Sequence, residues 1–301
     1  MKSSTRNIII TILAFIVTIL FFRILNHEHF TPSNSNNKPK IAFCFLIYDK
    51  LNHPTIWQNF FASADPSKYS IYIHYKDDVS LGEFFDKYKL DNCIPTKWND
   101  ISLAKAQYLL YKTAFTNDPN NTKFVILSNS CIPLWNFSTI YDKLTTDNNG
   151  YFNATDVKIQ SNPMEKYGYS ELLKSSQWCI LNRNHIQILL EHEAEMDNFV
   201  ASPTPDEYMF RTIINKYNTE NDITTINIDQ FPNNQTTFAL WNDQTTYKYH
   251  TNDFPANKTF SDISSEELDY IKECGSLFAR KFAIGCTIDN TRPLTSTDLF
   301  L

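Results

Sequence analysis

A continuous apolar run at 41–47 (IAFCFLI), bounded by polar residues, predicts a strand that is buried on both faces. An unbroken apolar run of this kind is typical of a parallel strand covered by helices on both sides. Residues 69–74 (YSIYIH) and 123–127 (KFVIL) predict a second and a third strand. Between the first two strands, residues 54–64 (PTIWQNFFASA) have helical spacing, which predicts a strand, helix, strand unit.

Two further helices are expected on the same sheet. Residues 102–115 (SLAKAQYLLYKTAF) are amphipathic, with Ser102 as the expected N-cap, and a helix over 138–144 follows the turn at 128–133. The first half of the chain therefore predicts an α/β layer of the nucleotide-binding kind. Ligands of such sheets bind at the carboxyl ends of the strands. The polar candidates at that edge are His74, Asp77 and Asn129.

The second half of the chain contains residues 202–214 (SPTPDEYMFRTII), where two prolines precede a predicted helix. Asp206 is expected to cap this helix, and Met209 and Ile213 belong to its buried stripe. Glu207 then lies in the first helical turn. It either complements the helix dipole or serves as a fixed general base at the rim of a cleft. The local residues leave both interpretations open.

The N-terminal pattern predicts a membrane anchor. Basic residues precede an apolar run, and Arg23 near its end can snorkel, so that residues 8–25 approach the roughly 20 needed to cross a bilayer. The following residues offer no small-residue cleavage site, which favours an uncleaved signal anchor. A cleaved signal peptide and a buried core helix are the alternatives. Residues 1–7 would form a cytosolic tail and residues 26–39 a polar stalk.

A type II topology of this kind would place residues 40–301 in the lumen of the endoplasmic reticulum or Golgi. We expect a single domain there, with a donor-binding half at about 40–150 and an acceptor-binding, catalytic half at about 151–285. A luminal glycoprotein could be modified at five sequons, Asn120, Asn136, Asn153, Asn234 and Asn257. Six cysteines also fit an oxidising compartment: Cys44, Cys93, Cys131, Cys179, Cys274 and Cys286. Three of these, Cys44, Cys131 and Cys179, lie in apolar runs and are also explained as core residues.

Composition excludes several classes of protein. The formal net charge is −6 without long charge runs, so nothing indicates a nucleic-acid surface. Only five glycines occur, and neither a P-loop nor a G-x-G-x-x-G motif is present. There is no C-x-x-C spacing for zinc and no Asp-x-Asp for a nucleotide-bound metal.

Six blocks of sequence, taken in order, carry a family resemblance. They occur at 40–46 (KIAFCFL), 69–74 (YSIYIH), 124–141 (FVILSNSCIPLWNFSTIY), 176–183 (SQWCILNR), 205–208 (PDEY) and 277–282 (LFARKF). Together they resemble the Core-2/I-branching β-1,6-N-acetylglucosaminyltransferase family, close to its plant-like branch. Each block alone is a weak signal, but six in order over nearly all of 40–282 are a specific one.

The resemblance implies a glycosyltransferase-A-type, Rossmann-like α/β/α sandwich, a type II topology and a nucleotide-sugar donor. It also implies inversion at the anomeric carbon without metal or cofactor, in agreement with the missing Asp-x-Asp. Glu207 matches the family's catalytic base. Lys281 matches a basic residue that contacts the donor diphosphate, and Arg280 stands beside it. Lys258 is the nearest candidate for a second family basic residue.

Tryptophans and departures from the family pattern bear on the acceptor. Trp241 resembles the family's acceptor-side tryptophan, with Asp206 as a second acceptor-side candidate, whereas Trp178 is expected in the core. Gln107 stands where relatives carry an acid, which we expect to affect a helix surface or a contact behind the site. Asp243 replaces an aromatic residue of animal members, so mucin-core specificity does not transfer.

The chemistry of such a transfer explains these residue types. A sugar hydroxyl is a poor nucleophile, so one carboxylate must accept its proton as the bond forms. The leaving diphosphate gains charge, which fixed cations can stabilise in place of a metal. Flat aromatic rings suit the C–H faces of sugars.

The sequence therefore predicts a metal-independent, inverting glycosyltransferase that moves N-acetylglucosamine from UDP-GlcNAc to a hydroxyl of a glycan or glycoprotein. Transfer of xylose is the nearest alternative, because related xylosyltransferases share several blocks. A glycan-binding membrane glycoprotein without turnover is an alternative of another class. A glycoside hydrolase would require two facing carboxylates, and only one is identified here.

Overall fold

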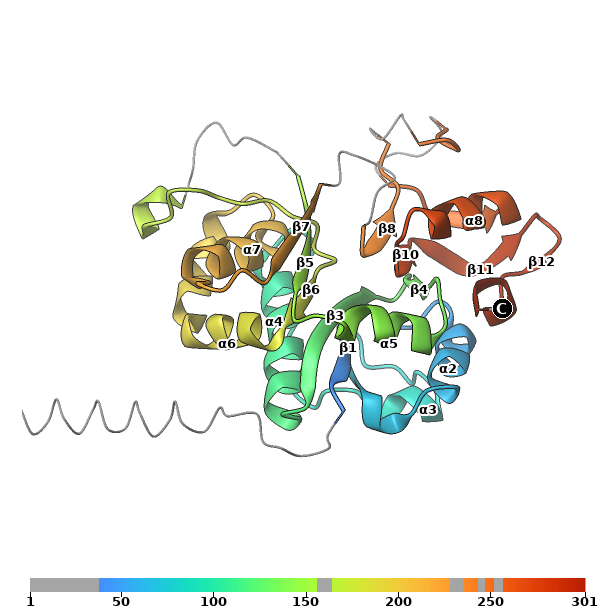
Figure 1. Cartoon of the computed structure of the whole chain (residues 1–301), viewed down its shortest axis with the longest axis horizontal. Coiled ribbons are helices and arrows are strands. Elements are labelled where there is room, and N and C mark those ends of the chain that lie inside the picture. Colours follow the sequence, from blue (N-terminus) through green and yellow to red (C-terminus); the bar gives the residue numbers. More distant parts are fainter. Residues whose placement is uncertain (1–37, 156–163, 228–234, 243–246, 252–256, 301) are drawn as a thin grey trace, which may run out of the picture. The chain divides into compact units, whose positions relative to one another are not determined.

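The computed structural model of the chain describes residues 38–155, 164–227, 235–242, 247–251 and 257–300. Residues 39–301 form one compact unit. Its centre is a six-stranded sheet in the order β2-β1-β3-β6-β5-β7 (Figure 1). The strands are β1 (Lys40–Ile47), β2 (Tyr69–Tyr75), β3 (Asn121–Ser128), β5 (Gly150–Ala154), β6 (Ile180–Asn182) and β7 (Ile223–Asn227).

Five of these strands run in the same direction, and β6 runs against them. The carboxyl ends of the five and the beginning of β6 therefore meet at one edge of the sheet, which we call the carboxyl edge. The predicted α/β class and its three apolar strands are confirmed.

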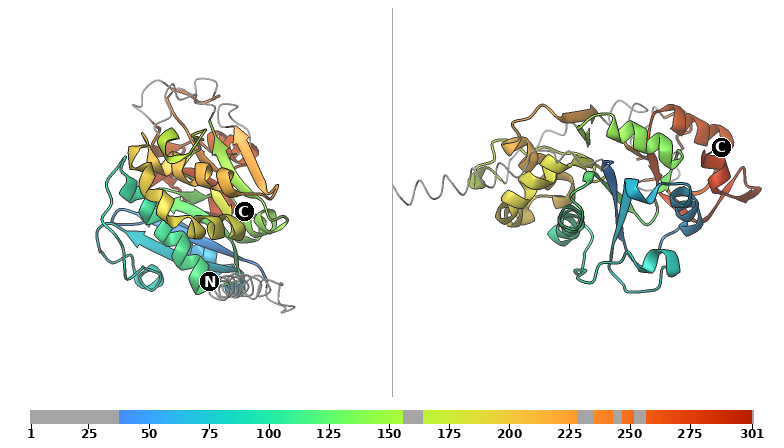
Figure 2. Two further views of the ribbon diagram at one scale, coloured as in Figure 1. Left: turned by 90° about the vertical axis from the view of Figure 1, so that its left-hand side faces the viewer. Right: turned by 60° about the horizontal axis from the view of Figure 1, so that its bottom comes forward.

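Alternating side chains of the central strands face two separate cores. On β1, Ala42 and Cys44 pack with α4, α6 and α7, whereas Ile41 and Phe43 pack with α2, α3 and α5. Figure 1 and both views of Figure 2 show α4, α6 and α7 gathered on one side of the sheet. The helices are α2 (Pro54–Ala62), α3 (Glu83–Asp86), α4 (Ile101–Asn117), α5 (Phe137–Thr145), α6 (Arg183–Glu191) and α7 (Pro205–Tyr217), with short 3₁₀ turns at Pro66–Lys68, Glu165–Tyr167 and Glu193–Ala201.

Two helix starts differ from the sequence prediction. Asp100, not Ser102, caps α4, because its carboxylate accepts a 2.9 Å hydrogen bond from the Ser102 amide. α7 begins with Pro205 at its first position, where the missing amide hydrogen is tolerated, so Thr204 is the N-cap and Asp206 lies in the first turn. The predicted buried stripe of α7 is confirmed, since Met209, Phe210 and Ile213 are buried.

The C-terminal part builds two small sheets around a third core. One sheet has the order β4-β10-β8 and the other β12-β11-β9. The strands are β4 (Ile132–Pro133), β8 (Thr237–Ala239), β9 (Phe260–Ile263), β10 (Phe278–Arg280), β11 (Phe282–Ile288) and β12 (Arg292–Pro293), with helices α8 (Ser265–Glu273) and α9 (Ser296–Phe300). Because β4 directly follows the β3 turn, pairing of β4 with β10 brings Arg280 to the carboxyl edge.

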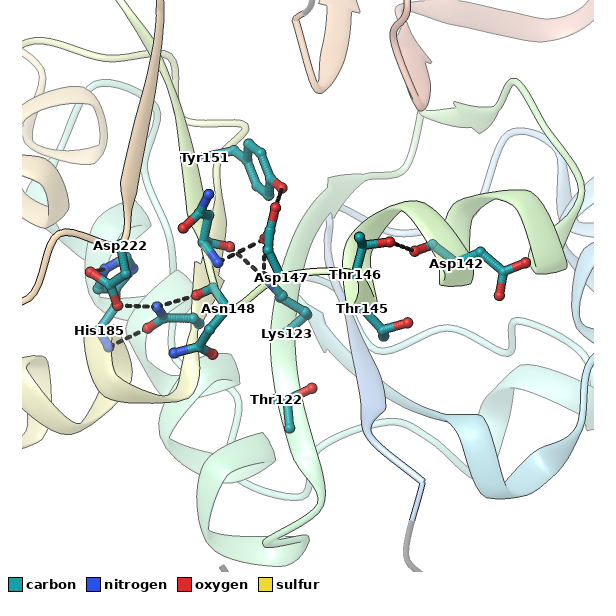
Figure 3. A network of polar contacts seen from close by, with 12 residues as sticks. Thr122, Lys123, Asp142, Thr145, Thr146, Asp147, Asn148, Tyr151, His185 and Asp222 are labelled. Carbon is teal, nitrogen blue, oxygen red and sulfur yellow. Dashed lines mark hydrogen bonds and ion pairs between the residues drawn. The ribbon is translucent and has the colours of Figure 1, made fainter.

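A polar network closes the opposite edge of the sheet, as Figure 3 shows. The Lys123 ammonium is fully buried, lies 3.4 Å from the Asp147 carboxylate and donates to the carbonyl of Asn149. Nearby, Asp222 accepts from the side-chain amide of Asn182 and lies 3.1 Å from His185 Nε2. Each buried charge is therefore partnered, as burial requires.

The structure bears on the expectations for the cysteines and for one of the sequons. All six cysteines are unpaired, and Cys44, Cys131 and Cys179 are buried core residues as predicted. The sequon residue Asn153 is 1% exposed and its side-chain oxygen accepts from Thr236, so it is not an accessible glycan site in the folded chain.

The expected anchor at 8–25, together with the tail and most of the stalk, lies outside the described residues, as do Asn234 and Asp243. Within the described ranges, no helix has the length and apolar character needed to span a bilayer.

Candidate active site

Three segments meet at the carboxyl edge through short hydrogen bonds. The Asn52 amide, after β1, donates to the Asn129 carbonyl at 2.9 Å, and the Asn129 side chain donates back to Asn52 Oδ1 at 3.3 Å. Asn52 Nδ2 also donates to the Phe282 carbonyl at 2.8 Å, and the Phe282 amide donates to Ser130 at 3.0 Å. The ends of β1 and β3 are thus fastened to the segment that carries Arg280 and Lys281.

Arg280 and Lys281 place two adjacent cations at this edge. The guanidinium of Arg280 lies 4.1 Å from the centre of the Trp178 ring, and its Nε is buried without a hydrogen-bond partner in the described part of the chain. Burial lowers the pKa of Arg280 to about 10, against the opposing effect of Cys131, so it remains charged at neutral pH. Burial, and then the neighbouring Arg280, lower the pKa of Lys281.

Neither of these cations has a carboxylate partner among the described residues. A half-buried pair of cations without a counter-ion favours an anionic ligand such as a diphosphate, because binding the anion relieves their mutual repulsion.

Lys258 lies on a segment that is hydrogen-bonded to Lys281, but its own ammonium pairs with another residue. The Phe260 amide, two residues after it, donates to the Lys281 carbonyl at 2.7 Å. The Lys258 ammonium itself lies 3.3 Å from Glu267, a carboxylate with 8% exposure that also accepts from the Tyr247 hydroxyl. Lys258 therefore has the carboxylate partner that Lys281 lacks.

Glu207 is held by two neighbours on the same oxygen. Its Oε2 lies 3.2 Å from the Lys174 ammonium and accepts a 3.1 Å hydrogen bond from Thr204 Oγ1. The side chain is 22% exposed, so a substrate can reach it. Burial, and then the Glu207 charge, raise the pKa of the adjacent Asp206 to about 6.

One short segment connects Glu207 with Arg280. The Ser175 amide donates to the Glu207 carbonyl at 2.9 Å, and Trp178, three residues later, receives the Arg280 guanidinium. The Trp178 carbonyl also accepts from Thr236 Oγ1 at 3.3 Å, and the Thr236 carbonyl accepts from the amides of Leu277 and Phe278, where β10 begins. Residues 175–178 therefore contact both the helix that carries Glu207 and the strand that carries Arg280 and leads to Lys281.

Trp241 lies at the end of the segment that follows β8. It forms a strand-like bridge with Asn257 and keeps 37% of its surface exposed. Trp178, in contrast, is 7% exposed, as expected for a core residue. Its ring contacts the Arg280 guanidinium in addition to apolar neighbours.

The remaining candidates, His74 and Asp77, lie at and just after the end of β2. His74 has no exposed surface, and its Nε2 accepts from the Ile94 amide at 3.0 Å; burial lowers its pKa to about 4, so it is neutral. A donor contact by His74 stays a prediction. Asp77 is exposed just after β2, and its amide donates a hydrogen bond to the Tyr48 carbonyl at 2.9 Å.

Sequence reasoning missed three residues of this edge: Tyr48, Asn52 and Lys174. Tyr48 is 53% exposed and carries the Lys76 ammonium 4.6 Å from its ring centre. Tyr48 and Asn52 lie within the five residues that follow β1, and this position was an available signal, since the carboxyl ends of strands were the expected ligand edge. The pairing of Lys174 with Glu207 joins distant segments and had no local signal.

Gln107 is a buried contact behind this edge and not a surface residue of α4. Its Nε2 donates to the Tyr111 hydroxyl at 3.0 Å and its Oε1 accepts from Gln177 at 3.2 Å. Gln177 directly precedes Trp178, so Gln107 supports the segment that carries this ring.

Neither a neighbouring cavity nor a cluster of metal ligands adds to the site among the described residues. A cavity of about 290 Å³ beside α5 includes Leu144, Tyr151 and Thr236 in its lining but neither Glu207 nor Lys281. Within the described ranges, no three His, Cys, Asp or Glu side chains converge as metal ligands. Metal independence remains a prediction.

Comparisons with known proteins define the class. The family model described as Core-2/I-branching enzyme matches residues 41–272. This chain belongs to the Core-2/I-branching enzyme family. Glycosyltransferase BC10 of Oryza sativa subsp. japonica is 28% identical over 170 residues, which are 53% of this chain and 42% of the rice protein. The aligned region thus spans less than half of that relative, and the resemblance to the plant-like branch is confirmed.

A solved glycosyltransferase involved in the glycosylation of the major capsid of PBCV-1 aligns with 79% of this chain and 92% of its own. Its identity is 9% and its TM-score 0.33, a likeness too low to carry an argument.

Proposed function

We propose that this chain is an inverting glycosyltransferase of the glycosyltransferase-A type that needs no metal. The donor is UDP-GlcNAc and the acceptor is a hydroxyl of a glycan or glycoprotein. The observation that carries the proposal is the pair Arg280 and Lys281, which stands without a carboxylate partner among the described residues and is fastened to the segment that holds Glu207. Family membership supports the reaction class.

The residues have complementary roles in a single displacement. The acceptor oxygen attacks the anomeric carbon while its proton passes to the Glu207 carboxylate. The bond between the anomeric carbon and the diphosphate oxygen breaks, and UDP leaves with the electron pair. Arg280 and Lys281 stabilise the negative charge that develops on the diphosphate. Trp241 offers a ring face to the acceptor sugar.

The same proposal extends to location. The basic and apolar pattern of residues 1–25 supports a type II signal anchor, which would put the catalytic part in the lumen of the endoplasmic reticulum or Golgi. Because the six cysteines are unpaired, disulfide bonds do not add support for a luminal location. Glycan attachment at Asn136, exposed at the start of α5, is compatible with this placement.

The experiment is transfer by the purified full-length chain with UDP-GlcNAc, UDP-xylose and other UDP-sugars, in EDTA and with a broad glycan panel. We expect turnover of UDP-GlcNAc in EDTA and a loss of about 10²–10⁴-fold in Glu207→Gln. Glu266→Gln, an exposed acid in the first turn of α8, is the matched control and should retain full activity.

Three outcomes would change the proposal. Preference for UDP-xylose would replace the donor. Activity only with added Mn²⁺ would overturn metal independence. Donor binding without turnover under any condition would favour a glycan-binding protein.

A further inference from the structure

The Glu207 carboxylate is anchored asymmetrically. The Lys174 ammonium and the Thr204 hydroxyl both contact Oε2, at 3.2 Å and 3.1 Å. No described residue forms a hydrogen bond or ion pair with Oε1. One oxygen is therefore fixed by the protein, and the other is available to a substrate.

The main chain at Lys174 is hydrogen-bonded to α7, the helix that carries Glu207. Its carbonyl accepts from the Arg211 guanidinium, one turn after Glu207 on α7, and the next amide, of Ser175, donates to the Glu207 carbonyl at 2.9 Å. The main chain of Lys174 is thus attached to α7 on both sides of its peptide unit. The Lys174 side chain therefore starts from a main-chain position that is bonded to the first turns of α7.

The surroundings explain why a cation is needed at this point. Asp206 and Glu207 are consecutive acids, and the Glu207 charge is one reason that Asp206 binds its proton more strongly. Lys174 contacts Glu207 Oε2 and also favours the ionised form of Asp206.

We propose that Lys174 is a positioning residue for Glu207. It holds Oε2 together with Thr204 and thereby directs Oε1 at the acceptor hydroxyl. The inference rests on the proposed function, in which Glu207 accepts the proton of that hydroxyl. A displacement of the base by about 1 Å can reduce turnover by about 10²-fold, so loss of the anchor should be seen in kcat.

The alternative is a surface ion pair with no role in turnover. Lys174 and Glu207 are 28% and 22% exposed, and ion pairs of this exposure contribute little to folding stability. Removal of Lys174 should therefore leave the chain folded, which allows activity to be measured directly. Lys112 on α4, whose ammonium lies 2.8 Å from Glu193, provides a more exposed ion pair for comparison, outside the candidate site.

The test measures kcat and the donor and acceptor KM for Lys174→Met, Lys174→Arg, Thr204→Val and Lys112→Met, with Tm as a check of folding. We expect Lys174→Met to lower kcat by about 10- to 100-fold with donor KM nearly unchanged. Arginine at this position should recover most of the loss, because a cation again faces Oε2. Thr204→Val should show a smaller loss, and Lys112→Met none.

A double variant separates positioning from structure. If Lys174 acts through Glu207, then Lys174→Met should add no further loss in a Glu207→Gln background. An equal fractional loss in both backgrounds would overturn the inference, as would wild-type kcat in Lys174→Met. Full activity in Glu207→Gln would instead overturn the proposed base, a different result from a failure of Lys174 alone.

Discussion

The Arg280 guanidinium carbon lies 4.1 Å from the centre of the Trp178 ring. A cation over an aromatic face is attracted by the ring quadrupole, and the attraction grows when water is excluded. Trp178 is buried, so this contact fixes a cation that has no carboxylate partner in the described ranges. The donor half of the candidate site is therefore held in shape by an aromatic ring and not by an acid, which leaves its positive charge for the ligand.

This contact predicts the effect of changes at Trp178. Trp178→Leu should weaken UDP binding by about 5- to 30-fold, the equivalent of the roughly 1–2 kcal/mol expected for a desolvated cation–π contact. Trp178→Phe should lose less, since a ring face remains. Isothermal titration with UDP measures both, and unchanged affinity in a folded Trp178→Leu protein would show that the ring does not position Arg280 for the nucleotide.

The two candidate lysines should behave differently. Lys281→Ala should lower kcat by about 10²-fold or more, because one donor to the developing diphosphate charge is lost. Lys258→Ala should instead lower the free energy of unfolding, because it leaves the poorly exposed Glu267 without its cation. Kinetics and urea unfolding on both variants distinguish the roles. The reverse pattern would transfer the diphosphate contact to Lys258.

Asp206 should make stability depend on pH. Its pKa in the folded chain is about 6, above its ordinary value of 3.8, so the folded state binds this proton more tightly. The resulting stabilisation is fully present below about pH 4 and is lost as the pH rises through about 6. Asp206→Asn should therefore gain stability relative to wild type between these values, by at most about 3 kcal/mol.

The measurement is urea unfolding of both proteins from pH 4.5 to 8. A constant difference in unfolding free energy over that range would contradict the assignment. Glu207→Gln should also lower the pKa of Asp206, because the Glu207 charge is one of the two effects that raise it. Carboxyl carbon NMR would follow this titration directly.

Gly150 faces the network at the amino edge of the sheet. A Cβ added there would overlap the imidazole ring of His185, and that ring is fully buried and bonded to Asp222. Overpacking of this kind should destabilise the chain by about 1–3 kcal/mol in Gly150→Ala. The same substitution should be milder in a His185→Ala background, where the ring is absent. Thermal unfolding measures both, and equal losses would exclude the steric explanation.

The parts of this molecule that follow from local pattern could be predicted from sequence. The apolar runs that became β1, β2 and β3 were visible because both faces of these strands are buried. The start of α7 was also visible, although a proline at the first helical position moves the cap to Thr204. Short strands such as β6, with three residues, carry too little periodicity to be recognised.

The candidate site was only partly visible. Glu207 and Lys281 were identified by resemblance, and their contacts depend on the fold. Lys174 meets Glu207 across 33 positions of sequence, and the ion pair of Lys258 with Glu267 had no local signal either. Side-chain type and spacing indicate which groups are suited to a reaction, whereas packing decides which of them are already engaged.

The reversed direction of β6 has a consequence for the length of the segment before it. Because β6 starts at the carboxyl edge, residues 174–178 cross that edge on their way into the strand and carry both Lys174 and Trp178. These five residues set the spacing between Lys174, the partner of Glu207, and Trp178, the partner of Arg280. A single inserted or deleted residue there would move either Lys174 away from Glu207 or Trp178 away from Arg280, so the residues between these two, 175–177, should tolerate substitution far better than a change of length.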